Sequence, residues 1–386
     1  MNNYIYRDIT PFLQYSASKF PIVTVTGPRQ SGKSTLLKNC FKDYQYLSLE
    51  NADIREMALM DPRGFLKKYS NHIILDEIQR APQLMSYLQT HVDNENKPGM
   101  FLLAGSQSFL LMQGLSQSLA GRTSLLTLLP FSRKELSSAG LLPESIDETL
   151  FKGMYPRLYN MDIPPSLYYP AYIQTYVERD VRDILKVTDL NKFIRFIKLC
   201  AGRTGQILNM SALANETGIS STTADGWMSV LEASYICYRL QPYYRNFNKR
   251  IIKAPKLYFY DTGLVCNLLG ISSPEQVSDF YLRGGLFENL VINQFIKNSY
   301  NSGNNPDLYY WRDSSGNEID LIDIKASILN AYEIKSGATF HSDFFKTLDK
   351  WGQLASVAHD KLNVIYTGDE SISTSKGNLI SFHNFL

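Results

Sequence analysis

The sequence predicts an α/β protein built from several domains, and three observations support this prediction. Short apolar segments rich in β-branched residues alternate with helical segments up to Pro130, as a parallel sheet with crossover helices requires. The chain has 386 residues, which is more than one hydrophobic core usually organises. Apolar residues make up 44% of it and charged residues 20%, near the averages of globular proteins, so packed domains are expected throughout.

Four regions follow from the order of the predicted elements. Residues 1–135 are expected to form a parallel sheet domain, residues 136–189 a helical lid or connector, residues 190–280 a winged helix-turn-helix domain, and residues 281–386 a second α/β domain. In the first region a strand that begins at Pro21 is followed by predicted strands at residues 46–49, 72–75, 100–104 and 124–129. In the last region the predicted order is a helix at 285–299, a strand at 308–312, a hairpin at 318–337, a helix at 343–359 and a strand at 363–367.

Composition excludes some classes of function and leaves others open. The formal net charge of +2 gives no electrostatic case for nucleic acid from the whole molecule, so such a case depends on local patches. Cys40, Cys200, Cys237 and Cys266 lie far apart, and neither they nor the five histidines have metal-ligand spacing. We find no leader segment and no run of eighteen apolar residues, so we expect a cytoplasmic protein without a membrane partner.

Residues 27–34, GPRQSGKS, match the phosphate-binding pattern GxxxxGK[ST] between a predicted strand and a predicted helix. The glycines let backbone N–H groups surround phosphate oxygens, and the helix directs its positive dipole end at them. We expect Lys33 to contact the β and γ phosphates of ATP and Ser34 to bind Mg²⁺. The predicted nucleotide-binding residues are Gly27, Pro28, Arg29, Gln30, Ser31, Gly32, Lys33, Ser34, Thr35, Asp76 and Ser106.

Two carboxylates follow a buried strand in NHIILDE, residues 71–77. They are expected at the carboxyl edge of the sheet, where the phosphates lie. Asp76 is predicted to hold Mg²⁺ through water, and Glu77 to polarise the water that attacks ATP. The alternative for Glu77 is a solvated residue that opens the next helix. The paired carboxylates favour hydrolysis over binding alone.

With these two motifs, the chain resembles the AAA-plus-like P-loop ATPases, and specifically a prokaryotic family with a C-terminal domain of unknown function. The resemblance also rests on FLLAGSQSFLL at 101–111, SLAGR at 118–122, LPFS at 129–132, YVERDVRDI at 176–184 and KLYFYDTGL at 256–264. It implies an enzyme that binds and hydrolyses ATP with Mg²⁺, with ATP and ADP as its ligands. It also implies a polar sensor of the γ phosphate at Ser106 or Gln107, although Asn or Thr is commoner at that position.

Arg122 is the candidate arginine finger, a residue that stabilises charge on the transferred phosphoryl group and usually comes from a neighbouring subunit. Arg179 is the second candidate. A finger that acts in trans implies a homo-oligomer, such as a ring or filament. The alternative for both arginines is a salt bridge to a nearby Asp or Glu.

The middle of the chain has a helix-turn-helix pattern at residues 209–235, with Gly218 at the turn and Ser220 or Ser221 as a cap. The second helix offers Asp225 and Glu232 but no basic residue, so it does not favour base-specific reading. The hairpin that follows has six basic residues: Arg239, Arg245, Lys249, Arg250, Lys253 and Lys256. Such a wing could track a nucleic-acid backbone without sequence preference, form a solvated hairpin, or serve as a lid on the ATPase domain.

Residues 311–337 look like the core of a PD-(D/E)XK nuclease. This resemblance implies that Asp320 and Glu333 bind Mg²⁺ with Glu288 as a further acidic ligand, and that Lys335 positions water or stabilises the phosphorane. Residues i and i+2 of a strand share a face, which explains the spacing of Glu333 and Lys335. The alternatives are a nuclease fold without activity, or a cross-strand salt bridge between Glu333 and Lys335 on an exposed face.

Together these features predict an ATPase that positions nucleic acid for a nuclease-like C-terminal domain. The rival interpretation is an ATP-dependent regulatory switch whose C-terminal domain binds a partner without cleaving it. Stimulation of ATP hydrolysis by DNA distinguishes the two.

Overall fold

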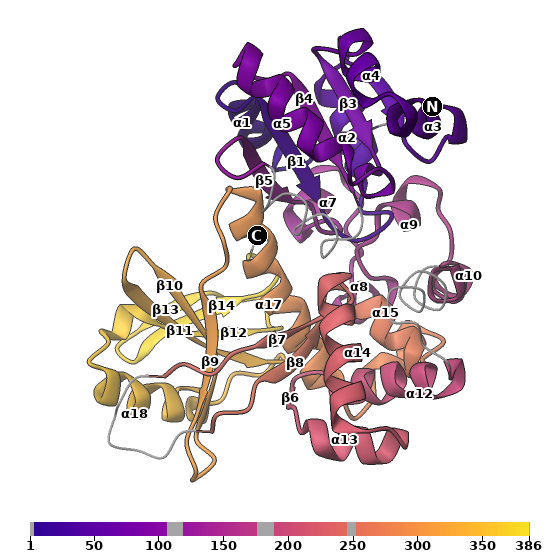
Figure 1. Ribbon diagram of the computed structural model, residues 1–386. Helices are drawn as coiled ribbons and strands as arrows, with labels where there is room; N and C mark the ends of the chain where they lie inside the picture. The colour runs from indigo at the N-terminus through magenta and orange to yellow at the C-terminus, as the bar shows by residue number, and fades with distance from the viewer. Residues whose placement is uncertain (1–3, 106–118, 176–188, 245–251, 386) are drawn as a thin grey trace.

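The computed structural model describes residues 4–105, 119–175, 189–244 and 252–385. Figure 1 shows a sheet domain at one end of the molecule and, at the other end, a group of helices with a second sheet beside them. Several predicted functional residues lie outside the described residues: Ser106, Gln107, Arg179, Arg245, Lys249 and Arg250.

The first sheet has five parallel strands. They are β1 (Ile22–Thr26), β2 (Gln45–Ser48), β3 (Ile73–Asp76), β4 (Phe101–Ala104) and β5 (Thr123–Thr127), in the order β2-β3-β4-β1-β5. The helices around it are α1 (Thr10–Ala17), α2 (Lys33–Cys40), α3 (Ala52–Met60), α4 (Pro62–Lys68) and α5 (Leu84–Glu95). The predicted parallel sheet is confirmed, and its strand ends differ from the prediction by one or two residues.

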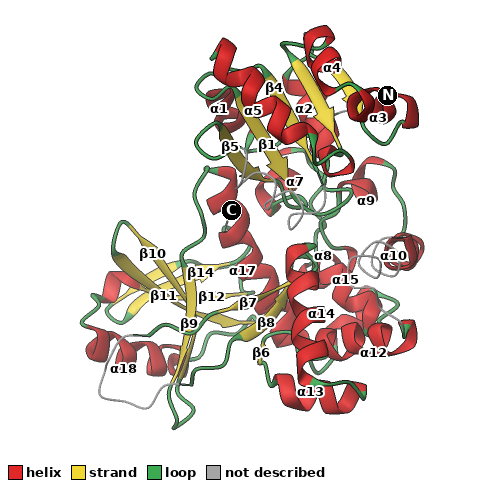
Figure 2. Ribbon diagram, viewed as in Figure 1, coloured by secondary structure: helices red, strands yellow, loops and turns green. Residues whose placement is uncertain are grey.

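Helices cover both faces of this sheet because both sets of alternating side chains are apolar (Figure 2). Ile73 and Leu75 on β3 pack with α3, α4 and α5, whereas Ile74 between them packs with α1 and α2. A parallel strand buried on both sides ends at a water-accessible edge of the sheet, and polar residues at that edge are available for a ligand.

Short helices connect the first sheet to the rest of the chain. They are α7 (Arg133–Ser138), α8 (Ile146–Lys152), α9 (Pro156–Asn160), α10 (Pro165–Tyr172), α15 (Thr262–Leu268) and α16 (Pro274–Ser278). A capping box in which Ser132 and Glu135 bond each other's backbone N–H groups begins α7. Buried tyrosines, among them Tyr155 and Tyr169, pack α9 and α10 together. The region predicted as a helical lid or connector, residues 136–189, is described as far as residue 175 and again at residue 189.

The helix-turn-helix segment includes three helices and a small antiparallel sheet. The helices are α12 (Leu190–Ala201), α13 (Met210–Thr217) and α14 (Ser221–Ala233), and the strands are β6 (Gln206–Ile207), β7 (Cys237–Leu240) and β8 (Lys256–Phe259), in the order β6-β8-β7. Gly218 ends α13 in a left-handed conformation, and the Ser220 side chain caps α14. Both residues therefore act as the sequence predicts.

The C-terminal sheet has six strands of mixed direction. They are β9 (Leu308–Arg312), β10 (Glu318–Lys325), β11 (Ile328–Lys335), β12 (Leu362–Tyr366), β13 (Ile372–Thr374) and β14 (Gly377–Ser381), in the order β13-β14-β12-β11-β10-β9. Helix α17 (Arg283–Asn301) packs on one face and α18 (Lys346–Ala355) on the other. Strands β13 and β14 were not predicted.

The middle helices and the C-terminal sheet share one hydrophobic core. This cluster of buried residues includes Ile5 of the N-terminal segment, extends from Leu129 to Phe382, and contains Trp227 and Phe287. The first sheet has cores of its own, above and below its strands. The molecule therefore has a five-stranded sheet domain attached to a larger body in which the middle helices pack against one face of the C-terminal sheet.

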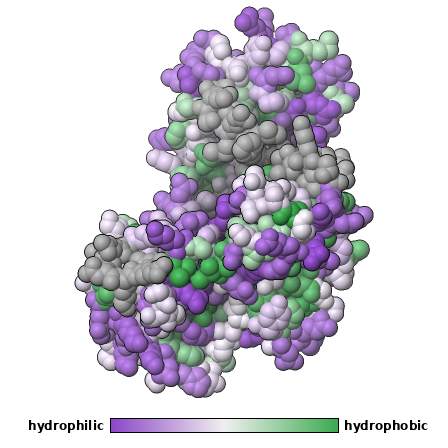
Figure 3. Space-filling model, turned by 60° about the horizontal axis from the view of Figure 1, so that its bottom comes forward, coloured by the Kyte–Doolittle hydropathy of each residue, from purple (hydrophilic) through white to green (hydrophobic). Residues whose placement is uncertain are grey.

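None of the helices in the described residues has the length and apolar character needed to span a membrane. On the face drawn in Figure 3, hydrophilic residues cover most of the described surface, and apolar residues lie in small groups between them.

Candidate functional site

The phosphate loop lies between the end of β1 and the start of α2. Gly27 has φ of +141°, and a side-chain carbon at this position would lie 2.1 Å from the backbone oxygen of Leu128. Gly32 has φ of +95° and directly precedes Lys33, the first residue of α2. Both positions require glycine, because other residues rarely adopt this conformation and Gly27 leaves no room for a side chain. The loop can therefore turn its backbone N–H groups inward.

Lys33 lies inside the loop and is almost fully buried. Its ammonium group donates hydrogen bonds to the backbone oxygens of Gly27 (3.0 Å) and Pro28 (2.7 Å). Burial lowers the pKa of Lys33 to about 8, while the charges of Glu77 and Asp76 act in the opposite direction. Because both hydrogen-bond partners are neutral carbonyls, phosphate oxygens could replace them as partners of this ammonium group.

Asp76, at the carboxyl end of β3, accepts hydrogen bonds from three donors. The Ser34 hydroxyl and the Tyr46 hydroxyl each donate to its Oδ2 atom at 2.5 Å, and the backbone N–H of Glu77 donates to Oδ1 at 3.0 Å. Ser34 and Asp76 provide the oxygen ligands that Mg²⁺ prefers, and they already touch. These residues therefore fit a magnesium site. Tyr46 was not predicted, because a single tyrosine on a strand carries no signal of its partner.

Glu77 has an unusual backbone conformation for a glutamate. Its φ of +54° and ψ of +44° are left-handed, and a short 3₁₀ turn begins at the next residue, Ile78. The Gln79 side chain donates a hydrogen bond to the Glu77 carboxylate. Burial raises the pKa of Glu77 above its ordinary value, with Lys33 opposing the effect. Strained residues of this kind cluster at functional sites, and a carboxylate with a raised pKa is a stronger base.

A cavity of about 700 Å³ opens over these residues. The residues that line it include Arg29, Lys33, Ser34 and Glu77. Arg157, on the connecting helix α9, also lines it. The side chain of Arg157 is exposed. The sequence did not identify Arg157, since it lies far from the motifs and only the fold brings α9 over the phosphate loop.

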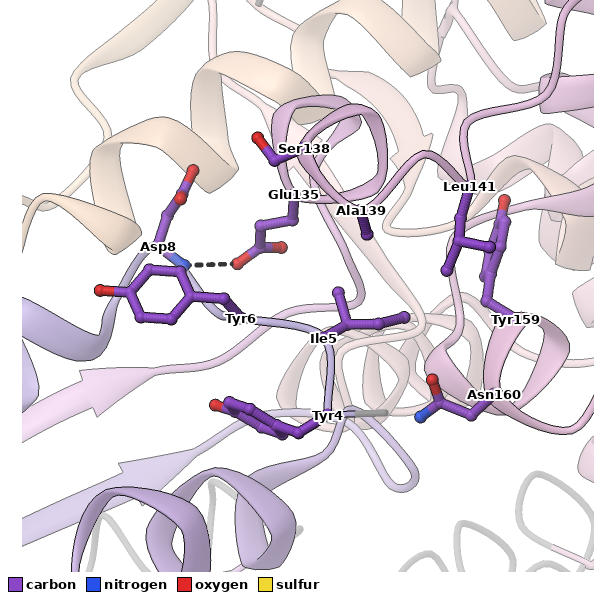
Figure 4. Close-up of a pocket in the computed structure, with 10 residues that line it drawn as sticks. All are labelled: Tyr4, Ile5, Tyr6, Asp8, Glu135, Ser138, Ala139, Leu141, Tyr159 and Asn160. Atoms are coloured by element: carbon purple, nitrogen blue, oxygen red, sulfur yellow. Dashed lines mark hydrogen bonds between the residues drawn. The ribbon is translucent and has the colours of Figure 1, made fainter. Parts of the chain in front are cut away.

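A second cavity of about 560 Å³ lies between the N-terminal segment and helices α7 and α9 (Figure 4). Tyr4 and Asn160 line both cavities, so the two adjoin. Figure 4 shows Asp8 bonded through its backbone N–H to Glu135 at the edge of this cavity.

Arg7, in the same N-terminal segment, is buried and connects the phosphate loop to α7. It donates to the backbone oxygens of Ser31 (2.8 Å) and Leu129 (2.6 Å) and pairs with the Glu135 carboxylate at 3.0 Å. The loop is therefore held by a charged residue outside its own motif.

Arg122, the predicted finger, is not brought to this cavity. It directly precedes β5, and its backbone oxygen accepts from the N–H of Ile22 at the start of β1. The phosphate loop follows the other end of β1, so the two lie at opposite edges of a parallel sheet. Its side chain makes a two-point salt bridge to Asp93 at 2.5 and 2.8 Å, which is the alternative raised from the sequence.

In the C-terminal domain, Glu288, Asp320 and Glu333 meet as one charged group that also contains Lys256, which the sequence placed in the basic hairpin. The ammonium group of Lys256, on β8, lies 2.8 Å from Glu288, also bonds Glu318, and is 3.9 Å from Asp320. Within the described residues, no three carboxylate, imidazole or thiol groups converge as a metal ion requires. These residues therefore do not fit the predicted Mg²⁺ site, because a lysine already lies among them.

Electrostatics in this group are consistent with the contacts. Burial lowers the pKa of Lys256, but the attraction of Glu288, Asp320 and Glu318 outweighs it, so the net shift is upward. Burial raises the pKa of Glu288 to about 7. Burial and the charge of Asp320 raise the pKa of Glu333 to about 8, and Lys335 bonds its Oε1 atom. Glu333 and Lys335 form a salt bridge, but both lie on β11 and Glu333 is buried, so it is not the exposed cross-strand pair raised from the sequence.

Most of the described basic residues of the 239–256 hairpin bond acidic groups within the chain. Arg239 pairs with Glu232 on α14, and Lys256 belongs to the carboxylate group above. Lys253 is exposed. The described part of the hairpin therefore offers little free positive charge.

Comparisons with known proteins agree with the fold. Residues 19–137 match the AAA domain family, residues 143–275 match a domain of unknown function called DUF8612, and residues 283–385 match another called DUF4143. The sheet, the phosphate loop and the first match define the N-terminal part of the chain as a P-loop AAA-like ATPase domain.

An uncharacterized protein of Mycobacterium tuberculosis is 30% identical over 336 residues, covering 86% of this chain and 74% of the relative. An uncharacterized protein of Mycobacterium bovis matches with the same values. The chain belongs to the same family as these proteins. Among solved structures, a Walker-type ATPase of Pyrococcus abyssi matches with a TM-score of 0.45 and 13% identity, covering 68% of this chain and 94% of that chain. AMPPCP-bound DnaA from Aquifex aeolicus matches with a TM-score of 0.31 and 15% identity, covering 58% of this chain and 85% of that chain.

Proposed function

We propose that this protein binds ATP with Mg²⁺ in the 700 Å³ cavity and hydrolyses it to ADP. The observation that carries the proposal is the contact between Ser34 and Asp76 beside Glu77, on the floor of a cavity that also contains Lys33. These four residues come from two sequence motifs that are far apart in the chain.

The roles follow from chemistry that each residue offers. Lys33 would exchange its two carbonyl partners for phosphate oxygens, which restores a full charge pair. Ser34 and Asp76 would hold Mg²⁺, which neutralises phosphate charge when bound. Glu77 would accept a hydrogen bond from the attacking water and take its proton. The backbone N–H groups of the loop would hold the phosphates in place.

Residues outside the motifs would complete the pocket. Arg157 on α9 lines the same cavity as Lys33 and Ser34, and its charge suits a phosphate oxygen. Tyr4 lies where the two cavities adjoin, and its ring could pack against the nucleoside.

The test is phosphate release by the natural protein and by Glu77→Gln, which keeps the shape of the side chain but removes its basicity. We expect hydrolysis to fall by about 10²-fold or more while fluorescent ATP still binds, because the base acts only in the reaction. Lys42→Met, an exposed lysine just after α2, is the matched control and should leave both unchanged. Full hydrolysis by Glu77→Gln would reject the role of Glu77.

The second candidate function is the ATP-dependent switch, in which the C-terminal domain binds a partner without cleaving it. The lysine among its carboxylates favours the switch over metal-dependent cleavage. The order α12, β6, α13, α14, β7, β8 suits a winged helix, but the exposed face of α14 has no basic residue. Phosphate release with and without DNA or RNA separates the candidates, since action on nucleic acid predicts stimulation and the switch predicts none.

A further inference from the structure

Each carboxylate of the C-terminal group has a partner within the chain, although the Oε2 atom of Glu333 is buried without a hydrogen-bond donor among the described residues. Glu288 accepts hydrogen bonds from Lys256 and from the Tyr258 hydroxyl, both on β8. Glu318 bonds Lys256 and, at 2.8 Å, Arg312. The remaining two are held within the sheet: Asp320 Oδ2 accepts from the backbone N–H of Ile334 at 2.8 Å, and Glu333 pairs with Lys335.

A divalent ion would compete with Lys256 for the same oxygens. Mg²⁺ needs six oxygen ligands at about 2.0–2.1 Å, so it must approach the Glu288 and Asp320 carboxylates more closely than the ammonium group does. The side chain of Lys256 is only 3% exposed, so the ammonium group has no route into solvent while β8 stays in place. A second cation next to a fixed one is repelled strongly in such a buried position.

The segment around Lys256 is fastened to the C-terminal sheet by its backbone. Tyr243 donates its N–H to the backbone oxygen of Tyr310 at 2.7 Å, and Ile252 donates to that of Arg312 at 3.0 Å. Both arms of the hairpin therefore lie against β9, the edge strand. Near the same junction, Gly285 at the start of α17 packs closely against Thr204. A side-chain carbon at position 285 would lie 2.7 Å from the backbone oxygen of Thr204.

We propose that Lys256 is the resident cation of this carboxylate group: its ammonium takes the place of a divalent ion and joins β8 to α17 and β10. The pattern that looks like a nuclease core then serves as a charged joint between the helix-turn-helix region and the C-terminal sheet. The C-terminal domain binds no divalent ion at Glu288, Asp320 and Glu333, and it does not cleave nucleic acid by a metal-dependent route.

The first experiment measures Mn²⁺ bound to the nucleotide-free protein by the loss of the free-ion signal in electron paramagnetic resonance. Ser34→Ala removes the contribution of the phosphate loop. We expect this variant to bind no Mn²⁺, and Ser34→Ala/Lys256→Met to gain a site that a further Asp320→Asn removes. Mn²⁺ that Ser34→Ala still binds, and that Asp320→Asn abolishes, overturns the proposal. Mg²⁺-dependent DNA cleavage lost in Asp320→Asn does the same.

The second experiment separates charge from fold. In metal-free buffer, Lys256→Met should lower the midpoint of urea unfolding because it leaves several buried carboxylates without their cation. Lys253→Met, an exposed lysine three residues earlier, is the matched control and should leave the midpoint unchanged. The double variant Lys256→Met/Glu288→Gln, which removes one charge of each sign, should recover part of the loss. If it is no more stable than Lys256→Met, the proposed joint is rejected.

Discussion

Lys33 and Lys256 are both buried lysines beside carboxylates, yet their partners differ in kind. Lys33 donates to two neutral backbone oxygens at the floor of an open cavity. Lys256 bonds two carboxylates directly and lies near a third, with almost no exposed surface. The ammonium group of Lys33 is therefore available to an incoming anion. The ammonium group of Lys256 is already neutralised by carboxylates of the chain. A lysine among acids therefore indicates a ligand site only when its own contacts can be exchanged.

The largest expected effect tests the first half of this comparison. Lys33→Met should lower ATP hydrolysis by about 10²–10³-fold, because it removes a charged donor aimed at the phosphates. Phosphate release at saturating ATP measures the effect, and Lys256→Met, where folded, should stay near the natural rate. An equal loss in both variants would mean that the two lysines serve one site.

A third buried lysine extends the comparison to pH. Lys297 on α17 donates to the backbone oxygen of Phe131 at 2.8 Å. Burial lowers the pKa of Lys297 to about 8. The charges of Asp261 and Glu135 oppose this shift, and the charge of Arg7 adds to it. The unfolded chain holds this proton up to about pH 10.5, so the free energy of unfolding should rise by about 3 kcal/mol between pH 8 and pH 10.5.

Urea unfolding of the natural protein and Lys297→Met across that range isolates this contribution, because all other groups titrate in both proteins. The natural protein should gain stability relative to the variant as pH rises. A constant difference between the two would show that burial does not lower the pKa of Lys297.

The contact between Tyr46 and Asp76 sharpens the account of the first site. Tyr46→Phe should raise the KM for MgATP by about tenfold, because partners of a metal-binding carboxylate typically affect metal affinity by that order. Tyr44→Phe is the control: its hydroxyl donates to the backbone oxygen of Gly99 at 2.7 Å, away from the phosphate loop. Equal effects in the two variants would point to packing rather than to Asp76.

The smallest expected effect concerns Arg122. Its salt bridge to Asp93 lies at the edge of the sheet opposite the phosphate loop, so Arg122→Ala should leave hydrolysis by a single chain unchanged. Phosphate release measured over a range of protein concentrations also tests a role in trans. A loss of about 10³-fold that grows with concentration would identify Arg122 as a finger supplied by another subunit.

The sequence alone determined the parallel sheet and the phosphate loop. Short apolar segments between helical segments predicted the ends of β1 to β5 within one or two residues. A strand that is buried on both faces needs apolar residues throughout, so such a segment is easy to recognise. The pattern GxxxxGK[ST] predicted the loop because its chemistry is local: two glycines, a lysine and a serine within eight residues. Asp76 and Glu77 were found for a similar reason, since they end a strand at the edge where the loop also lies.

Only the tertiary structure decided which charged groups meet. Tyr46, Arg157 and Arg7 come to the nucleotide site from segments without a motif, so nothing in their own sequence names their partners. The sequence assigned Lys256 to a basic hairpin, but in the folded chain it bonds Glu288, which lies 32 residues later in the sequence. Local patterns predict what a residue can do, while long-range packing selects its partners, and at Lys256 the partner turns a predicted metal site into an internal ion pair.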